Sequence, residues 1–287
     1  GKLLLLFIAV AWGSSMVVVK GSTDFIPPGR LLATRFTIAS IVLALIYRKK
    51  LKLIDKNYIK SGLIIGGFLF CAYFTQTTGV MLEMPGKSQF LSSAYCVFVP
   101  FIGGLILREK PKKYHIVAAT ICATGIILVS VGDSISILSS LCWATQIVAI
   151  AKWGKDKEPG LITLLQFMVA AILAWVFTLT QEHSSNIEIN QRVIFGVLYL
   201  GIVCSGLCFL FQTISQKTES PTSVSIILSF ENIFGIIFSI LLFNEHMTVN
   251  KAIGFVLMFT AILISELQPN FLKDKAEIYI DNEKDKR

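Results

Sequence analysis

Charged residues are scarce in this chain of 287 residues. Asp, Glu, Lys and Arg make up 15% of it, against roughly 25% in soluble domains, and there are three histidines. Hydrophobic residues make up 54%, and the mean hydropathy is +0.70. A soluble core cannot bury this much apolar surface. The balance excludes a soluble enzyme, a disordered chain and a disulfide-rich secreted domain, and it predicts that lipid surrounds much of the chain.

Motifs of catalysis and nucleotide binding are also absent. The chain has no H-E-x-x-H, no G-x-S-x-G and no G-x-x-x-x-G-K-[ST]. The six cysteines fall within apolar runs, and we interpret them as packing residues rather than metal ligands. We therefore expect no enzymatic activity, no cofactor and no metal.

Ten apolar runs of 16 to 21 residues occupy most of the chain, at or just below the length of a membrane-crossing helix. Only helices and closed barrels satisfy the backbone in lipid, and barrel strands are shorter and alternate in polarity. We predict an all-α integral membrane protein with ten transmembrane helices. The runs are Leu3–Val19, Leu31–Tyr47, Ser61–Val80, Ser88–Leu107, Tyr114–Val131, Ser134–Ala151, Leu161–Thr180, Val193–Gln212, Ser223–Phe243 and Ala252–Leu267.

The first run begins like a secretory signal, because Lys2 precedes an apolar stretch with an Ala-x-Ala sequence. The run continues to Val19, however, and its Trp12 has a counterpart in the second half of the chain. We expect a retained first helix. The chain opens at Gly1 rather than Met, so we also expect a few native residues to precede it.

Lys and Arg are distributed unevenly between the two sides of the predicted bundle. With the N-terminus inside, 20 of the 26 lie on the inner side and 5 on the outer side, while Arg35 lies within a helix. The positive-inside rule then places both termini in the cytoplasm. The net charge of +8 reflects this orientation, and we expect no nucleic-acid partner.

Two offsets relate the halves of the chain to each other. Each half holds five runs, an odd number, so the second half must enter the membrane in the opposite orientation; the basic loops of the first half match nearly cation-free loops of the second. We predict two inverted five-helix repeats, 1–131 and 132–267, followed by a cytoplasmic tail, 268–287. The first offset matches Ala11-Trp12 with Cys142-Trp143 and Arg35-Phe36 with Gln166-Phe167, and the second matches Gln76-Thr77 with Gln212-Thr213 and Pro85 with Pro221.

The stretch Phe90–Pro111 resembles the fourth helix and following loop of an EamA-type member of the drug/metabolite transporter superfamily. Ser229–Phe234 resembles the repeat of that motif, and Arg35-Phe36 and Ala11-Trp12-Gly13 resemble the second and first helices. The resemblance implies a ten-helix carrier of the bacterial inner membrane, most often an exporter of small metabolites such as amino acids. The superfamily also includes importers, nucleotide-sugar carriers and drug exporters, so the solute stays open.

The family usually has Pro after the Glu of its ninth helix, and this chain has Asn232 there. The reason to expect a helix break at this point is therefore missing, and a polar amide is present instead.

Arg35 and Glu231 are the strongest candidates for a site, because a charged side chain within a membrane helix needs a partner or a function. Arg35 could bind a solute carboxylate or a helix end, or reach the outer headgroups by snorkelling. Glu231 could exchange a proton during transport, or it could accept hydrogen bonds in a structural role.

Uncharged polar and aromatic residues within the runs give a softer signal. They either line a pocket or join helices by hydrogen bonds, and the paired tryptophans could instead anchor the chain at the interface. Gly62 and Gly66, four residues apart, predict close helix contact rather than binding. The predicted solute-binding residues are Trp12, Arg35, Tyr73, Gln76, Tyr95, Trp143, Gln146, Gln212, Glu231 and Asn232.

The sequence thus predicts a secondary transporter, monomeric or weakly dimeric, that exports a small metabolite by alternating access. Its partners are the solute, the lipid bilayer and a proton as candidate coupling ion. One alternative is an exporter of drug-like or lipid-like compounds with the same fold. Another is an integral membrane enzyme, which would require acidic, His or Arg residues clustered in a cytoplasmic loop; the inner loops are instead short and rich in Lys.

Overall fold

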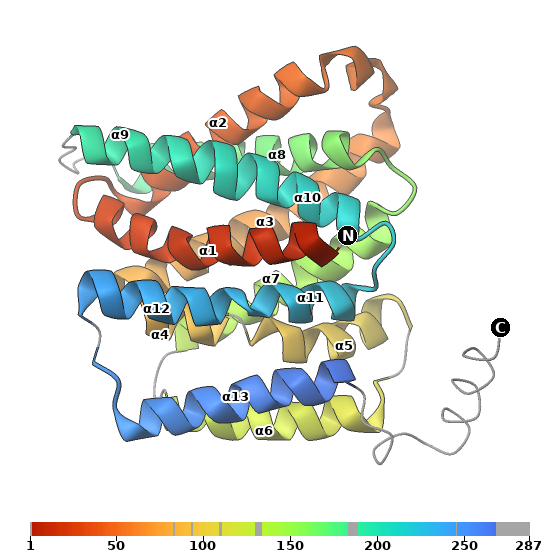
Figure 1. The fold of residues 1–287 in the computed structure, drawn as a ribbon. Helices are drawn as coiled ribbons and strands as arrows, with labels where there is room; N and C mark the ends of the chain where they lie inside the picture. The colour runs from red at the N-terminus through yellow and green to blue at the C-terminus, as the bar shows by residue number, and fades with distance from the viewer. Residues whose placement is uncertain are drawn as a thin grey trace.

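The computed structural model describes residues 2–82, 84–92, 94–108, 111–129, 134–182, 189–244 and 246–267, and all regular elements in these segments are helical (Figure 1). The predicted tail, 268–287, lies outside them. The elements are α1 (Lys2–Thr23), α2 (Pro28–Ile46), the 3-10 helix η1 (Arg48–Leu53), α3 (Lys56–Leu82), α4 (Pro85–Ser92), α5 (Tyr95–Ile106), α6 (Lys113–Val129), α7 (Ser134–Trp153), α8 (Pro159–Gln181), α9 (Gln191–Leu198), the π-helix η2 (Tyr199–Leu207), α10 (Cys208–Ser215), α11 (Pro221–Ser229), α12 (Glu231–Phe243) and α13 (Val249–Leu267).

Seven helical segments of the described chain are long and apolar enough to cross a membrane. Large apolar side chains face outward on several of them, such as Leu105 at 84% exposure and Ile172 at 60%, as expected where lipid is the solvent. Two shorter apolar helices are Glu231–Phe243 and Val249–Ala261. The seven long segments are Leu3–Thr23, Pro28–Ile46, Lys56–Leu82, Pro85–Ile106, Ile135–Trp153, Pro159–Gln181 and Gln191–Ser215.

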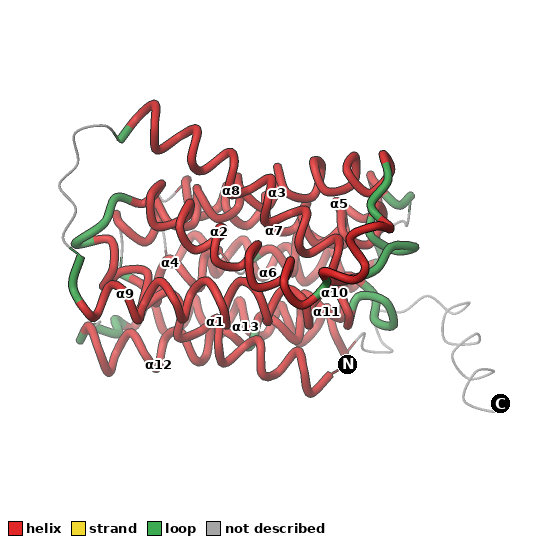
Figure 2. The backbone as a smooth tube through the Cα atoms, turned by 90° about the horizontal axis from the view of Figure 1, so that it is seen from above, coloured by secondary structure: helices red, strands yellow, loops and turns green. Residues whose placement is uncertain are grey.

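The helices lie side by side in one bundle, and the connecting loops lie at its two ends (Figure 2). α6 packs along α13 at one edge of the bundle, and α2 packs along α8 toward the opposite edge (Figure 1). Between these pairs, α3 packs on both α7 and α8, and α1 packs on α10, α11 and α12. The helices α1, α3, α7 and α12, which carry most of the polar candidates, therefore lie between these two pairs.

α2 and α8 run in opposite directions along their shared contact. Gly29, at the start of α2, lies against Phe177 and Thr178 near the end of α8. Gly160, at the start of α8, lies against the ring of Tyr47, just after α2, and leaves no room for a side chain there. Since Gly29 and Gly160 match each other at the first repeat offset, the two ends of this contact are built from equivalent positions.

A carboxylate stands at each end of the α2–α8 pair. Glu182, which follows α8 and is buried, accepts hydrogen bonds from the backbone N–H of Gly29 (2.8 Å) and Arg30 (3.0 Å) in the first turn of α2. Glu158, which precedes α8, forms a more exposed ion pair with Lys50 (2.8 Å). The hydrogen bond to Glu158 raises the pKa of Lys50. The buried carboxylate satisfies backbone N–H donors at the start of α2 that have no partner within the helix, whereas the exposed carboxylate joins η1 to the start of α8.

Gly62 and Gly66 allow α3 to approach α8 closely, as their spacing predicts. A Cβ atom on Gly62 would lie 2.6 Å from Leu165 Cβ, and one on Gly66 would lie 2.7 Å from the carbonyl oxygen of Gln166. Any larger residue would push the two helices apart.

The fourth and ninth apolar runs are each divided into two helices. α4 ends at Ser92 and α5 begins at Tyr95; α11 ends at Ser229 and α12 begins at Glu231. The missing proline puts a helix break beside Asn232 in doubt, but the structure has such a break at Phe230. The backbone makes the break without proline, by i→i−3 hydrogen bonds that tighten the turn.

The two breaks are alike. Ala94 N–H donates to the Leu91 carbonyl (3.2 Å), and Phe230 N–H donates to the Ile227 carbonyl (3.3 Å). The two donors match each other at the second repeat offset, and so do the two acceptors. Each break places one residue, Tyr95 or Glu231, at the start of a half-helix inside the bundle.

Candidate functional site

Four aromatic rings meet at the centre of the bundle. The ring centroid of Trp12, on α1, is 4.9 Å from that of Phe209, on α10, and the Trp143 ring, on α7, is 4.9 Å from that of Tyr73, on α3. The two tryptophan rings are 6.3 Å apart. Because Trp12 matches Trp143 at the first offset, and Tyr73 matches Phe209 at the second, equivalent positions of the two halves form one cluster.

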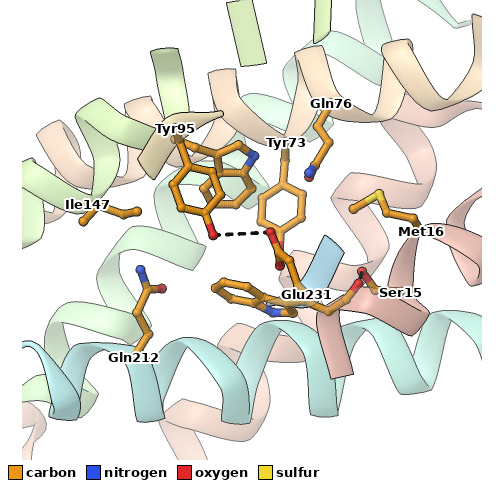
Figure 3. A pocket seen from close by; sticks show the side chains of 10 residues that line it. Ser15, Met16, Tyr73, Gln76, Tyr95, Ile147, Gln212 and Glu231 are labelled. Carbon is orange, nitrogen blue, oxygen red and sulfur yellow. Dashed lines mark hydrogen bonds between the residues drawn. The ribbon is translucent and has the colours of Figure 1, made fainter. Parts of the chain in front are cut away.

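A small cavity lies beside these rings (Figure 3). It has about 20 Å³ of room, which is enough for one or two water molecules and much less than the roughly 300–1,000 Å³ of ordinary ligand pockets. Its walls come from α1, α3, α5, α7, α10 and α12, that is, from both halves of the chain. The lining residues are Trp12, Ser15, Met16, Tyr73, Gln76, Tyr95, Trp143, Ile147, Gln212 and Glu231.

Eight of these ten residues form four pairs at the two repeat offsets. Each pair brings one side chain from the first half and its match from the second half to the same cavity. The pairs are Trp12 with Trp143 and Met16 with Ile147 at the first offset, and Gln76 with Gln212 and Tyr95 with Glu231 at the second.

Tyr95 and Glu231 also contact each other directly. The Tyr95 hydroxyl donates a hydrogen bond of 3.3 Å to Glu231 Oε1, drawn as the dashed line in Figure 3. Both side chains are 4% exposed. Glu231 lies in the first turn of α12, where the positive end of the helix dipole favours a negative charge. Among the described residues that line the cavity, Glu231 is the one charged at neutral pH in its ordinary state.

Arg35 is buried between α2, α3 and η2, and it is not among the residues that line the cavity. Its Nε donates to Ser205 Oγ (3.1 Å), and its Nη2 donates to the Tyr73 hydroxyl (3.3 Å). The guanidinium carbon lies 4.5 Å from the Tyr73 ring centroid, and the residue is 1% exposed. The buried side chain therefore does not reach toward headgroups, and it supports the ring of Tyr73, which lines the cavity, while its Nη1 is buried without a partner.

The π-helix η2 is held by two of the predicted residues. Trp12 Nε1–H donates to the Cys204 carbonyl (2.8 Å), while Arg35 binds the next residue, Ser205. A π-helix changes the direction of backbone and side chains within a helix and is frequent at functional sites. Here it joins α9 to α10, which carries Gln212 into the cavity wall.

The structure brings seven of the ten predicted residues together at the cavity and places three outside its lining. Besides Arg35, these are Gln146, whose Nε2 donates to Gln166 Oε1 (3.1 Å) and so joins α7 to α8, and Asn232, which is buried at 3% exposure. Ser15, Met16 and Ile147 line the cavity but were not predicted. Their positions could have indicated them, since each lies one helical turn after Trp12 or Trp143 and so on the same face of the helix.

Among the described residues, no group of three or more His, Cys, Asp or Glu is placed to hold a metal ion. The side chains that line the cavity offer one carboxylate, two tyrosine hydroxyls, one serine hydroxyl, two amides and aromatic faces.

Comparison with known proteins identifies the family and the fold. The model of the EamA-like transporter family matches the chain twice, over residues 1–131 and 130–267. An uncharacterized transporter of Archaeoglobus fulgidus is 26% identical over 92% of this chain and 85% of its own length. A protein of Escherichia coli named "Probable amino-acid metabolite efflux pump" is 22% identical over 91% of this chain and 93% of its own. A solved crystal structure shares the fold with a TM-score of 0.71 at 16% identity, and the match covers 93% of this chain and 98% of that one.

Proposed function

The chain belongs to the EamA-like transporter family and is a multi-pass membrane protein, and we propose that it exports a small metabolite, such as an amino acid, by alternating access. The observation that carries this proposal is the cavity at the centre of the bundle, which both halves line with matched residues. Carriers built from two repeats place their solute at the interface between them.

Two inverted repeats, 1–131 and 132–267, account for the geometry best. Helices related by an axis in the membrane plane run in opposite directions, and α2 and α8 do so along their whole contact. The same relation accounts for the two matched helix breaks and for the excess of Lys and Arg on one side of each half. It makes ten crossings, with α4–α5 and α11–α12 as one broken crossing each.

The small size of the cavity supports a cycle in which the solute is enclosed between two open states. With room for one or two water molecules, the cavity must widen before it can take a metabolite. The bundle offers a simple way to widen it, because the cavity walls come from helices of both repeats and the repeats can rock against each other.

The loops and a relative support a proposal for the location and the direction of transport. We propose that both termini lie in the cytoplasm of a bacterial inner membrane, and the excess of Lys and Arg on one side supports this orientation. Export is supported by the name of the E. coli relative. Glu231 is the residue of the cavity that could take up a proton during the cycle, and we propose a monomer or weak dimer as the working unit.

Counterflow in liposomes tests this function. Purified protein in vesicles preloaded with an unlabelled amino acid should take up the same amino acid in labelled form, with other metabolites as competitors. Trp143→Ala and Gln76→Ala should abolish the exchange, because both side chains line the cavity. Trp175→Ala is the matched control, since Trp175 lies on the surface of α8 and bonds Thr37 instead.

The mechanism has a separate test. A cysteine placed at Met16 in a cysteine-free background should change its reactivity toward a membrane-impermeant reagent when solute is present, because the cavity opens and closes. Reactivity that is identical with and without a transported solute would contradict alternating access. Absence of exchange for every metabolite in a broad panel would contradict the proposed function.

A further inference from the structure

We propose that the cavity recognises the ammonium group of a small organic cation, and that it prefers an amine to the amino acid from which that amine would form by decarboxylation. This inference rests on the proposed transport function and names the solute class within it. It is carried by the charge, the aromatic faces and the hydrogen-bond acceptors of the residues that line the cavity.

The residues that line the cavity carry charge of one sign. Glu231 supplies a carboxylate from α12, and the described lining residues include no Lys, Arg or His. The nearby guanidinium, that of Arg35, donates from Nε and Nη2 to Ser205 and Tyr73 outside the lining, and its buried Nη1 has no partner in the structure. Among the lining residues, a solute carboxylate would meet the like charge of Glu231 in a medium of low dielectric, whereas an ammonium group would meet an opposite charge.

Aromatic faces surround the same space. Trp12, Trp143, Tyr73 and Tyr95 all line the cavity, and their π-systems attract cations. Tyr73 already shows this property, because the Arg35 guanidinium carbon lies 4.5 Å from its ring centroid. Aromatic faces bind alkylammonium groups in proteins, and in this cavity they surround a carboxylate.

Hydrogen-bond acceptors complete the arrangement. Gln212 is 1% exposed and lines the cavity, and its Oε1 has no partner in the structure. A buried amide oxygen without a partner is unfavourable unless a ligand or water supplies the missing donor. In Figure 3, Gln212 and Glu231 both reach toward the centre of the cavity. A primary ammonium group carries three N–H donors, and these two side chains can accept two of them.

A matched set of three probes tests the preference directly. Tyramine, tyrosine and 3-(4-hydroxyphenyl)propionate share one phenol, and they differ in whether they carry the ammonium group, both charged groups or the carboxylate. Binding of labelled tyramine to the purified full-length protein in detergent is measured first, with the other two as competitors. Isoamylamine with leucine and putrescine with ornithine extend the comparison to smaller and doubly charged solutes.

We expect at least one amine to bind ten-fold or more tightly than its parent amino acid, and the phenylpropionate not to compete. Glu231→Gln should weaken amine binding by ten-fold or more and reduce the difference between amine and amino acid. Glu182→Gln is the matched control, because it removes a buried carboxylate at the end of α8 and should leave the selectivity unchanged.

Each remaining outcome is decisive. If amino acids bind or exchange as well as the amines, the inference is wrong and the proposed function stands. The same holds if a folded Glu231→Gln variant keeps its preference for the amine. If no amine of the series binds or exchanges, the inference is wrong, and if the amino acids also fail in counterflow, the proposed function fails with it. Thermal unfolding of each variant identifies losses that come from misfolding.

Discussion

The two halves of the molecule agree in backbone and differ in chemistry. Both contribute a tryptophan and a glutamine to the cavity, and both break a helix by the same turn. After that turn, however, the first half places the hydroxyl of Tyr95 and the second half the carboxylate of Glu231. Thus the two halves form a nearly symmetric framework, and the charge of the cavity comes from Glu231 alone among the matched lining residues.

A second difference lies behind the cavity. Arg35 supports the Tyr73 ring in the first half, while its match in the second half is Gln166, which bonds Gln146. Trp12 Nε1–H is bonded to η2, whereas Nε1–H of Trp143 has no partner in the structure. Duplication therefore provides the scaffold, and substitutions at matched positions make the two sides of the site unequal.

The largest effect is expected when the residues of the Tyr95–Glu231 pair are exchanged. Glu231→Tyr removes the carboxylate and should lower counterflow by about 100-fold, the effect of losing one partner of a desolvated charged contact. Adding Tyr95→Glu returns a carboxylate to the cavity from the other half and should recover part of the activity. If the single variant transports as well as the native protein, Glu231 is not part of the binding site.

The close approach of α1 to α12 gives the next effect. A Cβ atom on Gly13 would lie 2.5 Å from Phe234 Cβ and 2.7 Å from the Glu231 carbonyl oxygen, so Gly13→Ala must push α12 away. We expect a loss of about 1–3 kcal/mol in stability, measured by thermal unfolding in detergent. Gly21→Ala, on the same helix, meets nothing within 4 Å and should be neutral or slightly stabilising.

The matched position to Gly13 is Ala144, which is buried in α7, so the second half accepts the methyl group that the first half excludes. Equal effects of Gly13→Ala and Gly21→Ala would show that α1 and α12 are less closely packed than described.

Substitution of each paired tryptophan by phenylalanine separates the stability contribution of a hydrogen bond from that of ring volume. Trp12→Phe loses the bond from Nε1 to the Cys204 carbonyl, whereas Trp143→Phe loses the same volume and no bond within the protein. Trp12→Phe should therefore cost about 1 kcal/mol more, the net value of an ordinary buried hydrogen bond. The difference between the unfolding midpoints of the two variants measures this cost. A larger loss of stability for Trp143→Phe than for Trp12→Phe would contradict the stabilising role of the Trp12 hydrogen bond.

The smallest effect is expected at the ends of α2 and α8. Glu182→Gln removes a charge that accepts two backbone N–H groups at the start of α2 and should cost about 0.5–1 kcal/mol. Glu158→Gln breaks the exposed pair with Lys50 and should not change the unfolding midpoint measurably. Equal losses of stability in the two variants would mean that the buried and the exposed carboxylate stabilise the α2–α8 pair equally.

Much of the site could be predicted because polar side chains in apolar helices must find polar surroundings. Gln76, Gln212 and Glu231 stand out in the sequence for this reason, and the structure places all three on the cavity. Met16 and Ile147 could not be found in this way, because an apolar residue that lines a cavity looks like one that faces lipid.

Arg35 shows where sequence reasoning ends. Its position within a helix predicted a buried charge or a snorkelling one, but the choice depends on Ser205 and Tyr73, which belong to other helices. The break at Phe230 was missed for a related reason. It depends on a tightened turn of ordinary residues, and its match at Ala94 becomes visible only when both backbones are known.

The sequence by itself determined that the chain is a helical membrane protein with two related halves, because length, polarity and the distribution of charge act on each segment separately. Only the tertiary structure decided that matched residues meet at one cavity, that its charge is a carboxylate, and that the nearby arginine is bound elsewhere. Those outcomes depend on which helices pack together, and packing is set by small residues such as Gly29 and Gly160, which act between distant parts of the chain.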